Sequence, residues 1–364
     1  MIYKWGELIA LEYGKPVKDK ARTDGQYPVY GTNGQIGTSN LTPLCDHPSF
    51  ILGRKGAYRG VHYSSVPFSV IDTAFYAVNL HPDILDIKWA YYRFLTYDIN
   101  SMDSGSAIPS TDRYEIYAIE VDLPDIDEQK REVKLLECFD DKIANITEIN
   151  DNLQQQAQAL FEQRFIVEDI EGEEKPLYDF ADYINGAAFK PSECGDQGLP
   201  IIKIAELKNG ITDSTKYFDG FKGEKYLVHD KDILFSWSGN PDTSIDIFIW
   251  THGKAILNQH TFNVKSNTGH RWFTFLMLKY FRPEFSRIAS NKQTTGLGHV
   301  TASDLKRLTF ISNEAAIEVF EHEVSPFMET IYSNMMENQR LAQLRDSLLP
   351  KLMSGEIDVS GIQT

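Results

Sequence analysis

Two long stretches of the chain carry apolar residues at spacings of three and four, the pattern of one face of a helix. The first stretch runs from Asp127 to about Phe165, and the second runs from Asn313 to about Leu349. No proline or glycine interrupts the first stretch before Gly172. We therefore expect two long helices that pack like the strands of a coiled coil.

The apolar positions of these helices are expected to pair the two helices in an antiparallel arrangement and to dock partner proteins. In the first helix they are Leu135, Phe139, Ile143, Ile146, Leu153 and Leu160, and in the second they are Ile317, Val324, Ile331, Leu341 and Leu348. Pro326 lacks a backbone N–H and should kink or restart the second helix. Asn334 and Asn338 fall on the apolar face, either as points of local solvent access or as a polar pair that fixes the helix register.

The segments on either side of the first helix mix short β-rich runs, Gly-rich loops and one amphipathic helix each, which predicts α+β domains. We expect a first domain over 1–124, a helix and linker over 125–175, a second domain over 176–313, and a helix and tail over 314–364. In the two domains, the amphipathic helices are predicted near 84–97 and 272–281.

Four landmarks recur in the same order, which indicates a duplication. The run ending at Gly56 resembles the run ending at Gly239, 183 positions later. Phe75 corresponds to Phe262 and Asp112 to Asp304, with offsets of 187 and 192. In the helices, Leu153 corresponds to Leu341 with an offset of 188. A unit of domain plus helix that occurs twice predicts a pseudo-twofold molecule rather than a solenoid.

The charge of the chain constrains its function less than the total suggests. The net charge is −16, but the stretches 125–175 and 314–364 carry −9 and −6 of it, so the two domains together carry −1. The acidity therefore belongs to the helices and does not exclude nucleic acid from the domains. The three cysteines form no CxxC pair, and neither a membrane span nor a signal peptide is evident. We expect a soluble cytoplasmic protein.

The Gly-rich loops carry side chains suited to DNA. Residues 53–60 place three cations and a tyrosine among three glycines, and 32–35 offer two amides that suit adenine. Similar loops at 237–240 and 291–296 occupy matching places in the second domain. Ordinary polar surface turns are the alternative interpretation of any single loop. The candidate DNA-binding residues are Thr32, Asn33, Gln35, Arg54, Lys55, Tyr58, Arg59, Ser106 and Ser110 in the first domain, and Trp237, Ser238, Asn240, Lys292, Gln293 and Thr294 in the second.

A family resemblance is carried by the entry to the first helix and by the end of the second. The run Leu123-Pro124 followed by Glu128-Gln129-Lys130, with a later Asp-Asp-Lys-Ile element at 140–143, resembles the central helical region of type I restriction-modification specificity subunits. The run 344–357 resembles the C-terminal ending of the same family.

The resemblance implies two target-recognition domains that each contact one half of a split double-stranded DNA sequence. It also implies that the helices act as a spacer and dock methyltransferase subunits, expected to be two, with restriction subunits joining through the complex. The chain itself is then expected to bind no cofactor and no metal, while S-adenosylmethionine, ATP and Mg²⁺ belong to the partner subunits. One departure is that the chain enters the first recognition domain almost at once, without the N-terminal helical segment of some members.

Catalytic alternatives find little support in the sequence. Asn240-Pro241-Asp242-Thr243 departs from the Asn-Pro-Pro-aromatic motif of DNA methyltransferases, and the nine histidines show no metal-ligand spacing. Asp83 and Asp86 sit within about one turn of a predicted helix, where capping of that helix by Asp83 is a better explanation than a nuclease metal site. A non-DNA coiled-coil scaffold and the specificity subunit of a related fused restriction-methylation system remain as alternatives.

Overall fold

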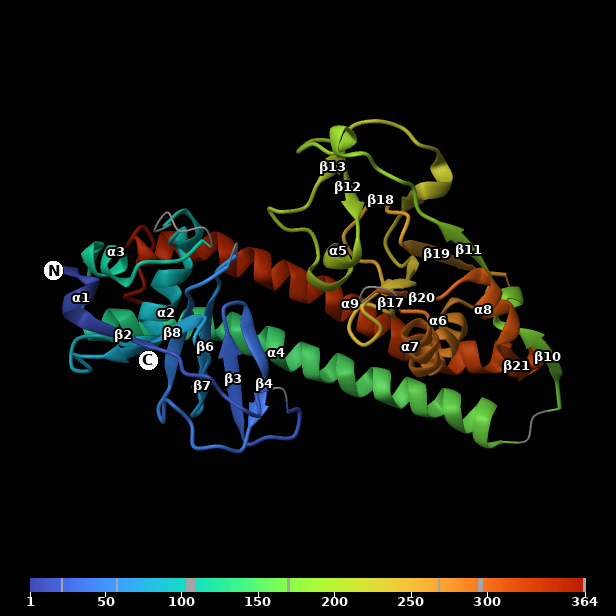
Figure 1. Cartoon of the computed structure of the whole chain (residues 1–364), viewed down its shortest axis with the longest axis horizontal. Helices are drawn as coiled ribbons and strands as arrows, with labels where there is room; N and C mark the ends of the chain where they lie inside the picture. The colour runs from blue at the N-terminus through green and yellow to red at the C-terminus, as the bar shows by residue number, and fades with distance from the viewer. Residues whose placement is uncertain are drawn as a thin grey trace. The chain divides into compact units, whose positions relative to one another are not determined.

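The computed structural model describes residues 1–20, 22–56, 58–102, 109–168, 171–267, 269–293 and 297–362. The chain divides into two compact units, Met1–Ile143 with Leu341–Thr364, and Ala144–Arg340. The two longest helices, α4 (Ile126–Glu162) and α9 (Glu314–Met353), each contribute to both units (Figure 1). α4 ends in a π-helical turn, η2 (Gln163–Val167).

The first unit is built on a four-stranded antiparallel sheet in the order β2-β8-β5-β6. These strands are β2 (Ile9–Tyr13), β8 (Ala74–Asn79), β5 (Ser49–Gly53) and β6 (Val61–Ser64). A second sheet has the order β4-β3-β7, with β4 (Gly34–Ser39), β3 (Tyr27–Gly31) and β7 (Ser69–Val70). β1 (Ile2–Lys4) pairs with β9 (Glu120–Asp122) and so ties the two ends of the domain together.

Helices complete the first unit and enclose its core. They are α1 (Trp5–Leu8), α2 (Ile87–Leu95), the 3-10 turn η1 (Ile99–Ser101) and α3 (Arg113–Ala118). α2 begins where the carboxylate of Asp86 accepts hydrogen bonds from two backbone N–H groups, as an N-cap does. The cap is therefore Asp86, and the prediction of Asp83 was wrong by one helical turn. Its buried Trp89 and Phe94 pack in one apolar cluster with Leu136 of α4 and Leu352 of α9.

The second unit repeats this plan. Its four-stranded antiparallel sheet has the order β11-β19-β15-β17, with β11 (Ala181–Asn185), β19 (Thr261–Ser266), β15 (Ile233–Ser236) and β17 (Asp246–Ile249). A smaller sheet has the order β13-β12-β18-β14, with β13 (Tyr217–Phe218), β12 (Leu199–Ile202), β18 (Ala255–Leu257) and β14 (Leu227–Val228). β10 (Glu173–Pro176) pairs with β21 (Thr309–Ser312), and β16 (Ser238–Gly239) pairs with β20 (Gly298–His299). β10 lies where the sequence predicted the solvated end of a linker.

Within the described residues, the second unit has four short helices and three 3-10 turns in addition to its sheets. They are α5 (Ile204–Asn209), α6 (Arg271–Tyr280), α7 (Arg282–Asn291) and α8 (Ala302–Arg307), with the 3-10 turns η3 (Leu177–Phe180), η4 (Pro191–Glu193) and η5 (Glu224–Tyr226). The core of this unit is rich in phenylalanine, and Phe161 at the end of α4 contacts the rings of Phe273, Phe310 and Phe320.

The internal repeat is confirmed at the level of strand register. Leu52 lies opposite Phe75 in the first sheet, and Phe235 lies opposite Phe262 in the second. Gly56 and Gly239 both have positive φ, 123° and 136°, a backbone conformation that favours glycine. The fold class predicted from the sequence, α+β with two mixed domains and two long helices, is therefore correct.

One landmark of the predicted repeat is wrong by three residues. Asp112 is the N-cap of α3, whereas the N-cap of α8 is Thr301 and Asp304 is the third residue of that helix. Asp112 and Thr301 are therefore the equivalent residues. The error arose because both caps carry an acidic residue within one turn, and the sequence does not show which residue is the cap itself.

The long helices pair within the second unit, where their contacts run antiparallel. Arg164 of the π-helical turn forms an ion pair with Glu323 at 2.9 Å. Farther along the pair, Asn334 donates to the Asn150 Oδ1 at 2.8 Å and Asn338 donates to the Thr147 Oγ1 at 3.1 Å. Of the two interpretations of these asparagines, the structure supports polar pairs between the helices. Pro326 does not restart the helix, since α9 is continuous through it.

Burial along the helices departs from the predicted stripe at Leu160. This side chain is 37% exposed, and the adjacent Phe161 is fully buried. Ile146, Ile317, Val324 and Ile331 are buried, whereas the remaining predicted positions are half-buried: Leu135, Phe139, Ile143, Leu153, Leu341 and Leu348. The buried apolar surface of each long helix is therefore narrower than the set of apolar positions predicted from the sequence.

Candidate functional site

Three loops of the first domain converge beyond the end of β5. Gly53 donates its backbone N–H to Gly60, and Lys55 donates to Thr73. Thr111, just before α3, donates to the carbonyl of Arg54 at 2.9 Å. These main-chain bonds hold the loops 53–60, 71–73 and 109–111 together and place their side chains on one surface, which we call the first-domain edge.

Two of the predicted DNA-binding residues instead hold this edge together. Thr32 uses its hydroxyl on the carbonyls of Lys55 and Thr73, at 2.8 and 2.7 Å. Arg59 is 2% exposed, and its guanidinium donates to main-chain carbonyls, among them Ile99 and Asn100. Neither group is available to DNA, so both predictions are corrected. Both residues stabilise the loop because buried carbonyls need donors.

Of five other candidates, three have exposed side chains and two have half-buried ones. Asn33 and Gln35 are exposed, and Tyr58 is 65% exposed. Asn33, with its amide nitrogen turned inward, donates to the carbonyl of Tyr58 at 2.7 Å. Lys55 is half-buried, and its backbone forms a bridge with Ser110, whose side chain is also half-buried.

Arg54 lies at the centre of a cluster of cations and aromatic rings. Its guanidinium lies 4.8 Å from the ring centroid of Tyr13 and 5.7 Å from that of Phe75. The guanidinium of Arg113 also lies near Tyr13, 5.1 Å from the centroid of the same ring. Tyr13 and Tyr114 remain 44% and 64% exposed. An exposed tyrosine with an arginine packed on its ring offers two kinds of contact. The ring can stack on a base, and the positive charge can contact a phosphate.

The corresponding surface of the second domain lies around Trp237 and Val300, and we call it the second-domain edge. It keeps the main-chain hydrogen bond of the first-domain edge but carries different side chains. Val300 donates to the carbonyl of Trp237 at 2.8 Å, as Thr111 does to Arg54. Trp237 stacks on Phe262 with ring centroids 5.5 Å apart and donates its indole N–H to Asn185 at 3.1 Å. Ser238 pairs through its backbone with His299. Trp237 therefore occupies the place of Arg54.

The remaining described candidates of this domain, Asn240, Gln293 and Lys292, differ in exposure and in hydrogen bonding. Asn240 is exposed, but its side-chain oxygen accepts hydrogen bonds from Asp242 and Thr243 and so shapes its own turn. Gln293 is exposed. Lys292 is bound internally, and its prediction is corrected. Ser106 and Thr294 lie outside the described residues.

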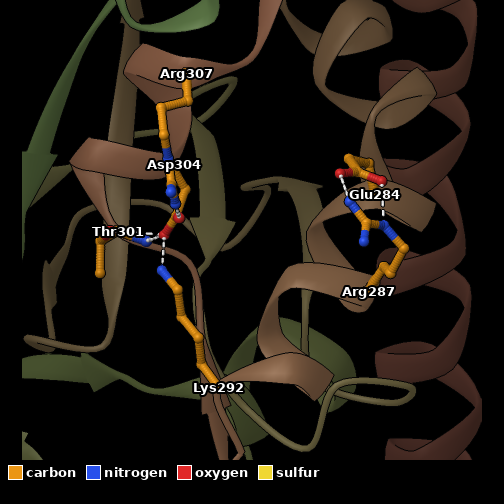
Figure 2. A network of polar contacts seen from close by, with 6 residues as sticks. All are labelled: Glu284, Arg287, Lys292, Thr301, Asp304 and Arg307. Carbon is orange, nitrogen blue, oxygen red and sulfur yellow. Dashed lines mark hydrogen bonds and ion pairs between the residues drawn. The ribbon is translucent and has the colours of Figure 1, made fainter.

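The partner of Lys292 is the fully buried Asp304 of α8 (Figure 2). Figure 2 shows Lys292, Thr301 and Arg307 converging on this carboxylate, while Glu284 and Arg287 form a separate pair on α7. Together, the hydrogen bonds from these groups hold the pKa of Asp304 far below its ordinary value, against the effect of burial. The carboxylate thus neutralises a cation that the sequence pattern assigned to DNA.

Sequence reasoning missed Tyr13, Arg113 and Asn185. Tyr13 ends β2 opposite Phe75, and Asn185 ends β11 opposite Phe262, so the two are equivalent. Each precedes a glycine, and a Cβ on Gly14 or Gly186 would lie about 2 Å from a backbone oxygen. This glycine is the signal that could have identified the position, at an offset of 172 rather than 183.

His62 lies against Gly34 and Gly60, and burial lowers the pKa of its imidazole. Over the described ranges, no three His, Cys, Asp or Glu side chains are grouped as metal ligands. No helix in the same ranges combines the length and apolar character needed to cross a bilayer.

Comparison with known proteins gives one consistent family. The model of the type I restriction modification DNA specificity domain matches twice, over residues 1–155 and 170–344. The chain is 24% identical over 307 residues to the specificity subunit of the type I restriction enzyme MjaIX of Methanocaldococcus jannaschii, covering 75% of this chain and 69% of that protein. It is 25% identical over 195 residues to the HindI specificity subunit of Haemophilus influenzae, covering 51% of this chain and 41% of that protein.

A solved structure has the same fold. The type I restriction-modification S subunit from M. genitalium superimposes with a TM-score of 0.54 at 14% identity, covering 97% of this chain and 95% of that one. The two family matches coincide with the two copies of the repeat.

Proposed function

The chain belongs to the type I restriction-modification DNA specificity family, and on that premise we propose that each of its domains contacts one half of a divided DNA sequence. It is a specificity subunit of such a system. The observation that carries the proposal is the double match of the DNA specificity domain to two copies of one fold. Two equivalent domains with different edge residues can contact two different half-sites.

The contact surface that we propose in each domain is the edge described above. In the first domain it presents Asn33, Gln35, Arg54, Lys55 and Tyr58, together with the cluster around Tyr13. In the second it presents Asn185, Trp237, Asn240 and Gln293. Support comes from the position of these side chains, which are exposed except for the half-buried Arg54, Lys55 and Trp237. Their chemistry also fits, since amides and arginine donate to base edges and aromatic rings pack on bases.

Specificity subunits of type I systems work with modification and restriction subunits. We propose that two methyltransferase subunits dock on α4 and α9, and that these partners, not this chain, hold S-adenosylmethionine, ATP and Mg²⁺. Apolar side chains that stay exposed on the long helices favour this placement. Ile149, Val319 and Leu344 are 50%, 54% and 46% exposed. Exposed apolar residues of this kind mark protein contacts when they gather in patches.

A scaffold that ignores DNA is not favoured, because both domains match a DNA specificity domain. The test of the proposal is to reconstitute the chain with the methyltransferase subunits of its own system, expose DNA of random sequence to the complex, and sequence the methylated bases. We expect a bipartite sequence, and affinity for that DNA should fall steeply with salt because phosphate contacts release counterions. Methylation without any sequence preference, or no DNA binding at any salt concentration, would contradict the proposal.

A further inference from the structure

The most informative feature beyond the domain plan is the pair of equivalent positions at the ends of the first and third strands of each large sheet. In the first domain these are Tyr13 and Arg54, and in the second they are Asn185 and Trp237. In each pair, one side chain is an aromatic ring and the other is a hydrogen-bonding group that the ring holds in place. The two roles are exchanged between the domains.

In the first domain the held group is the guanidinium of Arg54. It lies over the ring of Tyr13 and donates from Nη1 to the carbonyl of Asp72 at 2.8 Å. Within the described residues it makes no other hydrogen bond, so Nε and Nη2 keep their N–H groups for an outside acceptor. A planar fork with two adjacent donors matches the O6 and N7 acceptors of guanine.

In the second domain the held group is the amide of Asn185. Its Oδ1 accepts the indole N–H of Trp237 at 3.1 Å, which fixes the orientation of the amide. The side chain is exposed, and Nδ2 donates to none of the described residues. An amide oxygen has a second lone pair, so Asn185 still offers one acceptor and one donor side by side. That pattern matches N6 and N7 of adenine.

We propose that Arg54 discriminates a G·C pair in one half-site and that Asn185 discriminates an A·T pair in the other, with Tyr13 and Trp237 as the positioning residues. This inference rests on the proposed function, because it assumes that the edges meet DNA. It assigns a base to each domain. It also places the specificity-determining residue on the third strand of one sheet and on the first strand of the other.

The test is to map methylated sequences for the complete complex with conservative variants. Arg54→Lys keeps the charge but loses the planar fork, and Asn185→Asp keeps the acceptor for Trp237 but loses the amide donors. Each should reduce the preference for one base pair by about 5- to 150-fold, because a bidentate contact supplies about that much discrimination. The effect should be confined to a G·C pair of one half-site for Arg54→Lys and to an A·T pair of the other for Asn185→Asp.

Trp237→Phe keeps an aromatic ring but removes the indole donor, and it should relax the same A·T pair as Asn185→Asp by a smaller factor. The matched control is Arg287→Lys, the same chemical change on α7. Arg287 is already paired with Glu284 and is not one of the residues of the second-domain edge (Figure 2). It should leave both half-sites unchanged. Thermal unfolding and complex assembly of every variant separate a folding defect from a change in specificity.

The possible outcomes distinguish the two levels of the argument. If the wild-type complex methylates no bipartite sequence, the proposed function itself fails. If it does, but Arg54→Lys and Asn185→Asp leave every position of the sequence unchanged or weaken all sequences equally, the inference is overturned while the function stands. A change at a base pair other than the expected type also overturns the base assignment.

Discussion

The two units pack a domain helix against a long helix with different chemistry. In the first unit, the indole N–H of Trp89, the third residue of α2, donates to Glu132 of α4, and both side chains are buried. In the second unit, the third residue of α6 is Phe273, and it meets Phe320 of α9 with ring centroids 6.4 Å apart. A polar contact in one copy is therefore an apolar contact in the other.

A second pair of positions repeats the contrast. The hydroxyl of Tyr92, the sixth residue of α2, donates to Asp140 at 2.6 Å. The sixth residue of α6 is Leu276, which is fully buried in the apolar cluster that also contains Met328. The duplicated backbone therefore accommodates a polar contact between the domain helix and the long helix in the first unit and an apolar contact in the second. Burial raises the pKa of Glu132 to about 7.

The largest effect is expected where the second unit relies on aromatic packing. Phe320 is fully buried against Phe161, Phe165 and Phe273, so Phe320→Ala should destabilise the second unit by about 3–5 kcal/mol through lost contacts and a cavity. Urea unfolding with peptide-resolved hydrogen exchange should show the loss in the second unit. Val319→Ala, on the exposed side of the same helix, is the control and should cost less than about 0.5 kcal/mol. Equal effects of the two variants would contradict the packing described.

The next effect tests the polar solution of the first unit. An unfolded Glu132 loses its proton near its ordinary pKa of 4.5, whereas the folded side chain keeps it until about pH 7. The stability of the first unit should therefore fall as the pH rises from 4.5 to 7 and stay level above that. Glu132→Gln cannot ionise, so it should match the wild type at pH 4.5 and exceed its stability by about 3 kcal/mol above pH 7.

Urea unfolding at pH 4.5, 6 and 8 measures this difference directly. A Glu132→Gln variant that is less stable than the wild type at pH 8 would show that the charged carboxylate is needed in the core.

The smallest effect concerns the second polar pair. Tyr92→Phe removes the hydroxyl that donates to Asp140 and leaves that carboxylate with its ion pair to Arg345 at 2.6 Å. The expected cost is about 1–2 kcal/mol, confined to the first unit, because a hydrogen bond to a charged group contributes that order of stability. A cost well above about 3 kcal/mol would show that the hydroxyl does more than donate this one hydrogen bond.

Helices and strands could be predicted because their signals are local. The spacing of apolar residues located both long helices, and the repeated runs around Gly56 and Gly239 located the central strands. The choice between Leu160 and Phe161 could not be made in the same way. Both fit a spacing of three or four, and Phe161 is buried because the rings of Phe273 and Phe310 meet it from other elements.

The candidate site was predicted at the level of loops but not of side chains. Arg59 and Lys292 are cations in Gly-rich loops, yet their partners are the carbonyl of Ile99 and the carboxylate of Asp304, which only the fold brings to them. Tyr13 and Asn185 were missed because the loops that follow them differ in length, which shifts the repeat offset. Contacts with residues far away in the sequence therefore determine which cation of a loop is exposed.

The division of labour between the domains is the central claim, and grafting one domain tests it most directly. The strands β10 and β21 pair at the ends of the second domain, as β1 and β9 do in the first, so residues 178–308 can be exchanged between paired strands that remain native. The graft should come from a relative with a different DNA sequence, and the full complex should then be used to map methylation. We predict that one half of the bipartite sequence changes to that of the donor while the other half stays the same. A graft that altered both halves together, or neither, in a complex that still methylates DNA would contradict the account.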